Sequence, residues 1–276
     1  MANPAADALL ELLEVMARLR DPQQGCPWDR AQDFASIAPY TLEEAFEVAD
    51  AIERGEPAAI RDELGDLLFQ VVFHARLGEE RGWFDFAAVA AGIAAKLRRR
   101  HPHVFETAMP PGASAPAADW ERIKAAERGA AGEGGTLDGI ARALPALTRA
   151  AKLGRRAARV GFDWPDAGGV RDKVGEELAE IDEVLAAEAP AGRRVEELGD
   201  LLFAIANWSR HLGVDAEAAL RTANQKFERR FASMEALARE RGIALESLSG
   251  DAWEALWAEV KRDEFSEFRK HSSPSS

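Results

Sequence analysis

Residues 63–69 of the chain read Glu-Leu-Gly-Asp-Leu-Leu-Phe, and residues 197–203 read the same seven amino acids in the same order. Upstream of each copy stands Glu-Glu-x-x-Glu, which begins at residue 43 in the first half and at residue 176 in the second. The copies begin 134 residues apart (63 to 197), a period far longer than the roughly 20 to 50 residues of a solenoid repeat. The sequence therefore predicts two tandem copies of one domain.

The apolar residues indicate that both copies are helical. They recur mostly at three- and four-residue spacing, while runs of β-branched residues are short and tyrosine occurs once, so strands are not expected. Apolar stripes on separate helices need a partner surface, and we therefore expect a homodimer or a higher homo-oligomer to complete the bundles. The prediction is an all-α chain of tandem duplicated helical bundles, with helices at residues 5–20, 41–54, 57–81, 85–100, 140–159, 170–188, 192–212, 215–241 and 251–268.

A change of composition separates the halves. Residues 106–136 are rich in proline, glycine and alanine, which is typical of a linker region, although residues 118–128 read as a short helix. We predict an N-terminal domain at residues 1–128, a linker at 129–139, a C-terminal domain at 140–270 and a flexible tail at 271–276.

Charge and composition exclude several classes of protein. The 276 residues include 35 basic and 48 acidic side chains, for a net charge of −13, which would repel the phosphate backbone of a nucleic acid. No apolar run long enough for a membrane span and no signal peptide are written in the sequence. A single cysteine, Cys26, fits a reducing compartment. We expect a cytoplasmic protein that binds neither nucleic acid nor membrane.

The repeated acids predict metal sites. Residues three apart share one face of a helix, so two packed helices bring four carboxylates together, which would repel one another strongly without a cation. Oxygen ligands of this kind suit Mg²⁺, with Mn²⁺ as the alternative. The predicted ligands are Glu44, Glu47, Glu63 and Asp66 in the first half and Glu177, Glu180, Glu197 and Asp200 in the second.

These acids also have a plainer interpretation than a metal site. Acids spaced in this way often form a solvated helix face, and Thr41 with Glu44 also matches a capping box at a helix start. In the second half Val174 stands at the position of Thr41, so capping cannot explain Glu177. The repeated spacing favours the metal site. Gly65 and Gly199, inside the repeated helix, are expected to let a helix or a ligand approach closely.

Basic and aromatic residues follow each acidic segment and could hold a nucleotide. Cations can neutralise phosphate oxygens, and a tryptophan can stack on a base. The plainer interpretations are helix-end cations that complement the helix dipole and tryptophans that anchor a core. No phosphate-binding glycine loop is present. The candidates are Lys96, Arg99, Trp120 and Lys124 in the first half and Lys226, Arg229, Arg230, Trp257 and Lys261 in the second.

Together these segments resemble the two-domain form of the MazG nucleoside triphosphate pyrophosphohydrolases. Besides the two acidic patterns, the resemblance rests on Arg-Leu-Arg-Asp-Pro at 18–22, Gly-Cys-Pro-Trp-Asp at 25–29, Ile-Ala-Pro-Tyr-Thr-Leu-Glu-Glu at 37–44, Arg-His-Pro-His-Val-Phe at 100–105, Val-Gly-Phe-Asp-Trp at 160–164 and Lys-Phe-Glu-Arg-Arg-Phe at 226–231. It implies helical domains that dimerise and bind Mg²⁺ through the four acids. It also implies cleavage between the α- and β-phosphates, which yields the monophosphate and pyrophosphate.

The resemblance further implies different roles for the residues of the two halves. The acids of the second half would be catalytic metal ligands, and the cations and Trp257 would contact the phosphates and the nucleoside. The first half would hydrolyse other substrates, bind nucleotide without turnover, or serve assembly. A role in clearing unwanted nucleotides or in stress is implied as well. Two alternatives stay open: a related pyrophosphohydrolase of narrower substrate, such as dUTP, dCTP or phosphoribosyl-ATP, and a non-catalytic helical interaction protein.

Overall fold

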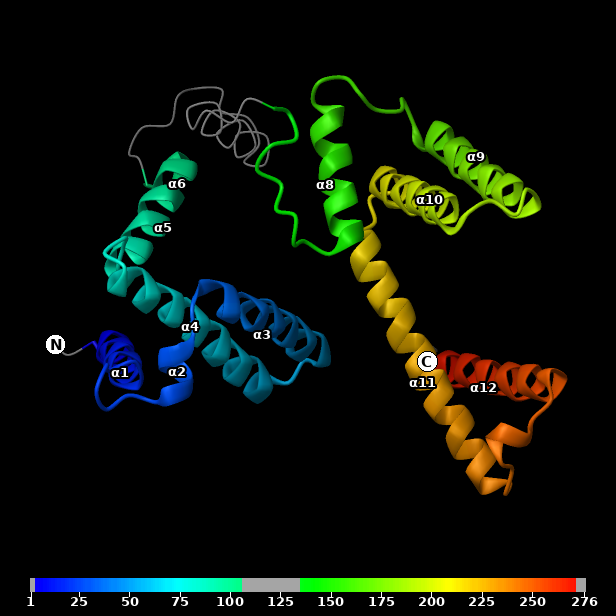
Figure 1. Ribbon diagram of the computed structural model, residues 1–276. Helices are drawn as coiled ribbons and strands as arrows, with labels where there is room; N and C mark the ends of the chain where they lie inside the picture. Colours follow the sequence, from blue (N-terminus) through cyan, green and yellow to red (C-terminus); the bar gives the residue numbers. More distant parts are fainter. Residues whose placement is uncertain (1–2, 106–134, 272–276) are drawn as a thin grey trace. The chain divides into compact units, whose positions relative to one another are not determined.

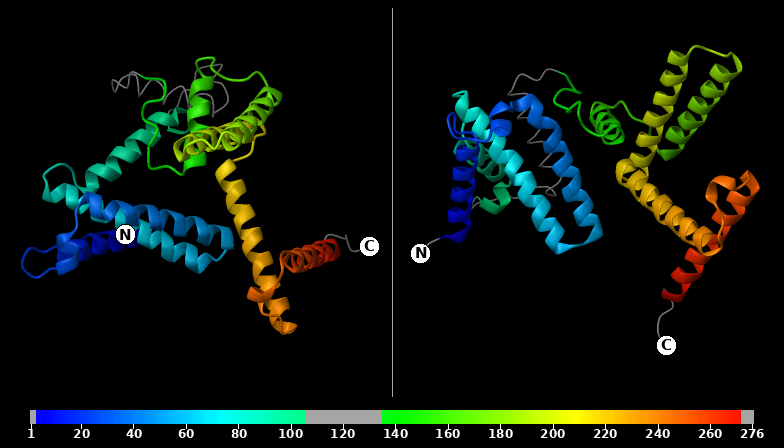
Figure 2. Two further views of the ribbon diagram at one scale, coloured as in Figure 1. Left: turned by 45° about the vertical axis from the view of Figure 1, so that its right-hand side comes forward. Right: turned by 60° about the horizontal axis from the view of Figure 1, so that its bottom comes forward.

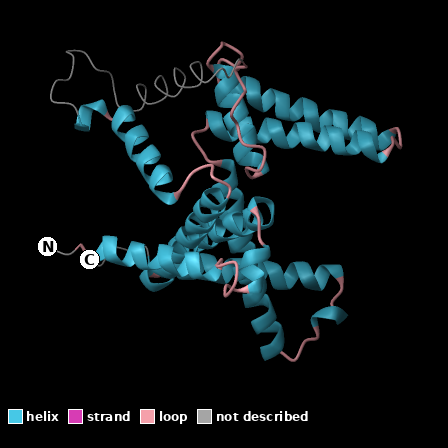
Figure 3. Cartoon of the chain, turned by 60° about the vertical axis from the view of Figure 1, so that its left-hand side comes forward, coloured by secondary structure: helices cyan, strands magenta, loops and turns pink. Residues whose placement is uncertain are grey.

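The computed structural model describes residues 3–105 and 135–271, and within these ranges it contains helices and no strand (Figures 1 and 3). The all-α prediction is confirmed. The chain divides into two compact units, which contain these two described ranges respectively. The predicted helix at 118–128, and with it Trp120 and Lys124, lies outside the described residues.

The first unit is built around a hairpin of two long helices. Helix α3 packs along α4 over most of its length, and α1 and α5 pack on α4 (Figures 1 and 2). Gly55 ends α3 with φ 72°, a left-handed conformation that glycine adopts without steric cost. The elements are α1 (Pro4–Leu19), α2 (Pro27–Ala31), α3 (Phe34–Arg54), α4 (Pro57–Glu80), α5 (Phe86–Arg100) and α6 (Pro102–Phe105).

The core of the first unit lies where α1, α3 and α4 meet. Met16, Ile37 and Phe73 are almost fully buried there, and each side chain of this size contributes about 1.5–3 kcal/mol when it leaves water. Arg20 closes one end of this core. Its guanidinium donates to both carboxylate oxygens of Glu80, at 2.9 and 2.7 Å, and to the carbonyl oxygen of Asp29. These bonds fasten the end of α1 to α4 and α2.

The second unit contains a hairpin of the same kind. Helices α9 and α10 pack along each other, α8 packs on α10, and α12 packs on α11 (Figures 1 and 2). The repeated Glu-Leu-Gly-Asp-Leu-Leu-Phe segment lies on the second helix of each hairpin, α4 or α10. The elements are α8 (Ala146–Ala158), α9 (Ala167–Ala186), α10 (Ala191–His211), α11 (Ala216–Glu240), the short helix η1 (Leu245–Ser247) and α12 (Gly250–His271).

Some helices begin at other residues than the sequence predicts. Helix α3 begins at Phe34, not at residue 41, because the carboxylate of Asp33 accepts hydrogen bonds from the backbone N–H groups of Ala35 and Ser36, both at 2.9 Å. Pro39 lies inside the helix, one turn after its start. The capping box at Thr41 is therefore wrong, since a residue inside a helix caps nothing. Helix α8 begins at residue 146 where 140 was predicted, and α2 and α6 were not predicted.

An ion-pair cluster joins the segment between α8 and α9 to the end of α10. The carboxylate of Asp163 accepts from the two terminal nitrogens of Arg210, at 2.5 and 2.9 Å, and lies 3.0 Å from Nε2 of His211. The hydrogen bonds from Arg210, and then that from His211, hold the pKa of Asp163 well below its usual range. The Val-Gly-Phe-Asp-Trp segment thus has a structural role in the second unit.

We expect Asp163→Asn to lower the free energy of unfolding by about 2 kcal/mol at pH 7. A carboxyl group whose pKa is lowered by folding stabilises the folded state above its unfolded pKa of about 3.9, and this stabilisation is lost as the pH falls further. The deficit should therefore be fully present at neutral pH and shrink below about pH 4. Urea unfolding across this pH series measures it. A deficit that is the same at acid and neutral pH would contradict the ion-pair explanation.

Candidate functional site

The first carboxylate cluster lies on the α3–α4 hairpin. Carboxylate oxygens of Glu44 and Glu47 on α3 and Glu63 on α4 all lie within 4.8 Å of one another. Asp66 lies outside this tight group, yet its charge acts on Glu44. The pKa of Glu44 is raised, first by burial and then by the charges of Asp66 and Glu47. The structure thus brings three of the four predicted ligands of the first half together, with Asp66 near enough to act on Glu44 through its charge.

The second cluster is more deeply buried. Carboxylate oxygens of Glu177 on α9 and of Glu197 and Asp200 on α10 lie within 4.8 Å of one another. Glu177 is 3% exposed and Glu197 is 4% exposed. Glu180 lies outside the tight group, but its pKa is raised by burial and then by the charge of Glu177, with a smaller contribution from Glu197. Glu177 and Glu197 are equivalent to Glu44 and Glu63, but the third member of the tight group differs, since it is Asp200 here and Glu47 in the first cluster.

One atom of the second cluster fits a cation. Oε2 of Glu177 is buried and has no hydrogen-bond partner among the described residues. A buried carboxylate oxygen without a partner is costly, and a bound metal ion is one of the few groups that can satisfy it. The oxygen donors of Glu177, Glu197 and Asp200 are the type that Mg²⁺ and Mn²⁺ prefer. The donor set of the second unit is therefore chemically suited to such an ion.

Two cations of the second unit were missed by the sequence analysis. Nζ of Lys173 lies 2.7 Å from Oε1 of Glu177, and Nη2 of Arg193 lies 2.5 Å from Oε1 of Glu197. Each cation also pairs with the preceding glutamate, Glu176 or Glu196, at 2.7 Å. The pKa of Lys173 is raised by its hydrogen bonds to Glu176 and Glu177. The sequence could have revealed these ion pairs, because each cation stands three and four residues before the two members of a Glu-Glu pair, a spacing that lets side chains meet on a helix.

The predicted substrate residues of the second unit lie on other helices than its acids. Lys226, Arg229 and Arg230 belong to α11, and Trp257 and Lys261 belong to α12, which packs on α11. The structure brings two of them together, with the guanidinium of Arg230 6.0 Å from the ring centre of Trp257.

Arg230 already has an anionic partner in the second unit. Its Nε donates to the carboxylate of Glu264 at 2.6 Å. A cavity of about 520 Å³ lies beside this pair, between α11 and α12, and Arg229 also lines it. Trp257 is half-buried against the α11–α12 core. The buried part of its ring therefore anchors this core, as the plainer interpretation expects.

The cations of the first unit are on α5. Lys96 and Arg99 are exposed on this helix, which packs against α4 and α6. Their positions among the last residues of the helix also suit the helix dipole. No described contact joins them to the carboxylates of the first cluster.

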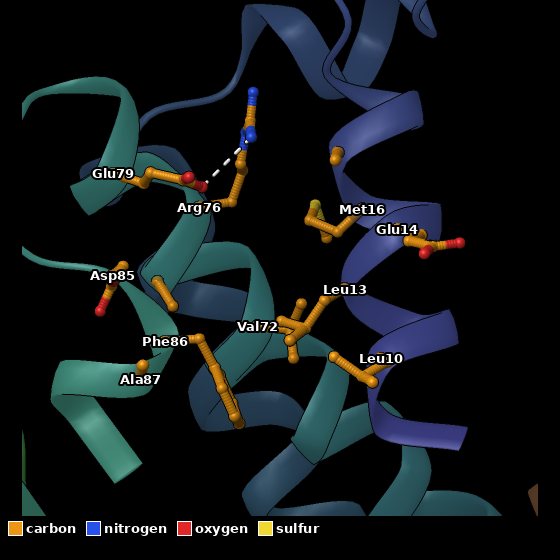
Figure 4. A pocket seen from close by; sticks show the side chains of 12 residues that line it. Leu10, Leu13, Glu14, Met16, Val72, Arg76, Glu79, Asp85, Phe86 and Ala87 are labelled. Atoms are coloured by element: carbon orange, nitrogen blue, oxygen red, sulfur yellow. Dashed lines mark hydrogen bonds and ion pairs between the residues drawn. The ribbon is translucent and has the colours of Figure 1, made fainter. Parts of the chain in front are cut away.

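The first unit contains an apolar cavity that is separate from its carboxylate cluster. A cavity of about 350 Å³ lies between α1, α4 and the start of α5, with Leu13, Val72 and Phe86 in its wall and Arg76 and Glu79 at its rim (Figure 4). On a helix with 100° per residue, the face of α4 that lines this cavity is opposite the face with the carboxylates. The cavity therefore belongs to the packing of α1 and not to the acidic cluster.

Comparison with known proteins places these features in context. Residues 32–105, which include α3, α4 and α5, match the MazG nucleotide pyrophosphohydrolase domain. The chain is 51% identical over 254 residues to the nucleoside triphosphate pyrophosphohydrolase of Escherichia coli, covering 92% of this chain and 97% of that protein. It is 43% identical over 252 residues to the nucleoside triphosphate pyrophosphohydrolase/pyrophosphatase MazG of Thermotoga maritima, covering 91% and 94%.

Proposed function

The chain belongs to the MazG family of nucleotide pyrophosphohydrolases, and from this membership we propose that it cleaves the α–β phosphate bond of nucleoside triphosphates at the second carboxylate cluster. It is a nucleoside triphosphate pyrophosphohydrolase, and the products are the nucleoside monophosphate and pyrophosphate. The observation that carries the choice of site is the buried carboxylate oxygen of Glu177, which has no partner among the described residues.

We assign the metal ligands from the same geometry. Glu177, Glu197 and Asp200 lie close enough to share one ion, and Glu180 lies one turn from Glu177 on the same face. Mg²⁺ is the proposed ion, since it binds few carboxylates and leaves positions for water and phosphate oxygens, and Mn²⁺ is the alternative. When bound, the cation would polarise the phosphate oxygens and make the attacking water more acidic.

The protein's own side chains would then position charge and protons. Glu180 lies one turn from Glu177 on the same helix face and would accept a proton from the attacking water. Arg230 and Lys261 would neutralise phosphate oxygens, and Arg230 would leave Glu264 to do so. Trp257 would contact the nucleoside with the exposed part of its ring. No covalent intermediate is required, because the reaction needs orientation and charge stabilisation above all.

We assign hydrolysis to the second unit and nucleotide or metal binding to the first. Glu177 and Glu197 are buried, whereas Glu47 is exposed in the first cluster. Burial lowers the effective dielectric constant and strengthens each electrostatic interaction with a substrate. The second cluster is thus the better environment for stabilising developing charge.

We also propose that the active protein is a homodimer. Leu64 and Leu68 on α4 and Leu198 and Leu202 on α10 are each exposed by more than 40%, and such apolar rows are normally covered by another surface. A second copy of the hairpin would cover them and could bring the cations of α11 and α12 to the acids of its partner.

The proposed setting of the enzyme is the cytoplasm, where it would clear unwanted nucleotides. None of the described helices is long and apolar enough to cross a membrane. The net charge of −13 disfavours a nucleic-acid partner. Free nucleoside triphosphates are therefore the proposed substrates.

We expect pyrophosphate release from a panel of ribo- and deoxyribonucleoside triphosphates to require the metal. Excess EDTA should lower the rate at least about 100-fold, and added Mg²⁺ should restore it, because the ion carries several kcal/mol of transition-state stabilisation. Product analysis separates pyrophosphate from orthophosphate. Full activity in EDTA, or orthophosphate as the product, would refute the proposal. Turnover confined to dUTP, dCTP or phosphoribosyl-ATP would instead favour the narrower enzyme class.

A further inference from the structure

The two carboxylate clusters differ in their counter-ions. In the second unit Lys173 and Arg193 each hold one buried acid of the cluster from one turn away, at 2.7 and 2.5 Å. The equivalent positions of the first unit, three residues before Glu-Glu-x-x-Glu and four before Glu-x-x-Asp, carry Tyr40 and Ala59. Neither of these side chains is charged. The repeat has therefore kept the acids of both clusters but supplies cations from these positions only in the second.

The two ion pairs join buried acids to partly exposed cations, since the side chains of Lys173 and Arg193 are 32% and 55% exposed. The side chains of Glu177 and Glu197 are 5% and 6% exposed, so the two ion pairs are only weakly screened on the acid side. Lys173 and Arg193 also pair with Glu176 and Glu196, so the formal charge of the four cluster carboxylates and these two neighbours falls from −6 to −4. A divalent cation that enters this cluster meets two positive charges already bound to its ligands.

The first cluster has the opposite character. Carboxylate oxygens of Glu44, Glu47 and Glu63 lie within 4.8 Å of one another, and none of the described ion pairs joins a cation of α3 or α4 to them. A divalent cation stabilises carboxylates most when they repel one another and have no other counter-ion. Such a cluster should bind the ion without help from a second ligand.

We propose that Lys173 and Arg193 are built-in counter-ions that weaken the affinity of the second cluster for a free divalent cation, so that this cluster loads its ion together with a polyanionic substrate while the first cluster loads on its own. The inference rests on the proposed function, since it takes both clusters as metal sites. A triphosphate brings negative charge toward which both cations can turn, and the acids are then released to the ion. The second unit therefore takes up metal and substrate cooperatively.

The test measures Mn²⁺ binding to the full-length protein by electron paramagnetic resonance, without nucleotide. We expect one tight class of sites, which Glu44→Gln with Glu47→Gln removes, and one weak class. Lys173→Gln with Arg193→Gln should tighten the weak class about tenfold. Tyr40→Lys with Ala59→Arg should weaken the tight class by a similar factor. Addition of a triphosphate with a non-hydrolysable α–β bridge should tighten the weak class in the wild type and much less in the Gln variant.

Matched variants separate the inference from a general effect of charge or folding. Arg171→Gln with Arg194→Gln removes the same charge from α9 and α10, at residues with no described pairing to the cluster, and should change Mn²⁺ affinity less than about twofold. Lys173→Arg with Arg193→Lys keeps both charges and should retain the weak class. If Lys173→Gln with Arg193→Gln leaves Mn²⁺ binding unchanged or weaker, the counter-ion inference is wrong. If the wild type binds no Mn²⁺ even with the analogue, the proposed metal sites themselves fail.

Discussion

Replacing Glu177 and Glu180 together by glutamine should lower pyrophosphate release from nucleoside triphosphates by at least about 100-fold, which corresponds to about 2.7 kcal/mol of transition-state stabilisation. Glutamine keeps the size of each side chain but removes a negative charge and a proton acceptor. Glu177 carries the buried oxygen that has no partner in the described chain, and Glu180 carries the raised pKa. The expected result is a fall in kcat, measured by pyrophosphate release at saturating Mg²⁺.

The matched control is the same change in the first unit. Glu44→Gln with Glu47→Gln alters the equivalent pair and should leave the rate within about threefold, provided that hydrolysis belongs to the second unit. Circular dichroism checks that both proteins remain helical. If the first pair abolishes turnover and the second does not, the division of labour is the reverse of the one proposed. If neither pair matters, the carboxylates are not the catalytic site.

The acidic clusters could be predicted because they depend only on helix periodicity. Glu44 and Glu47 share a face at any helix boundary, and a short connection to α4 forces Glu63 to meet them. The structure places these three carboxylates within 4.8 Å of one another. The rule that residues three apart share one helix face was therefore sufficient to predict this part of the site.

Helix boundaries were harder to predict because local signals compete. Pro39 and Thr41 favour a helix start near residue 41, yet α3 begins at Phe34. Asp33 with Ser36 supplies the cap that satisfies the first N–H groups, and Ile37 is then buried against α4. Tertiary burial of the extra turn outweighed the loss of one backbone hydrogen bond at the proline.

The roles of glycines also depend on what faces them across the fold. Gly65 and Gly199 were expected to permit a close approach, but a Cβ at either position would meet no described atom within 4 Å. A close approach between two helices is found instead at Gly154 on α8, which the sequence did not single out. A Cβ there would overlap the amide oxygen of Asn207 on α10. The partner of Gly154 lies 53 residues away in the sequence (154 to 207), so composition and spacing could not identify it.

We expect Gly154→Ala to lower the free energy of unfolding of the second unit by about 3 kcal/mol. Asn207 is 1% exposed, and it cannot move aside cheaply. Its amide nitrogen donates to the carbonyl oxygen of Phe203 at 3.1 Å, and its amide oxygen accepts from Nε of Arg210 at 3.3 Å. The added methyl group must therefore separate α8 from α10 or break these hydrogen bonds. Urea unfolding followed by circular dichroism measures the loss.

Two further variants make the Gly154 prediction specific to this contact. Gly175 lies inside α9, and a Cβ there would meet no described atom within 4 Å, so Gly175→Ala should stabilise the unit by up to about 1 kcal/mol through helix propensity. Asn207→Ala removes the atoms with which the new methyl group collides. The double variant should therefore lose less stability than the sum of Gly154→Ala and Asn207→Ala. Strict additivity would mean that α8 and α10 relax around the methyl group, and the steric explanation would then be wrong.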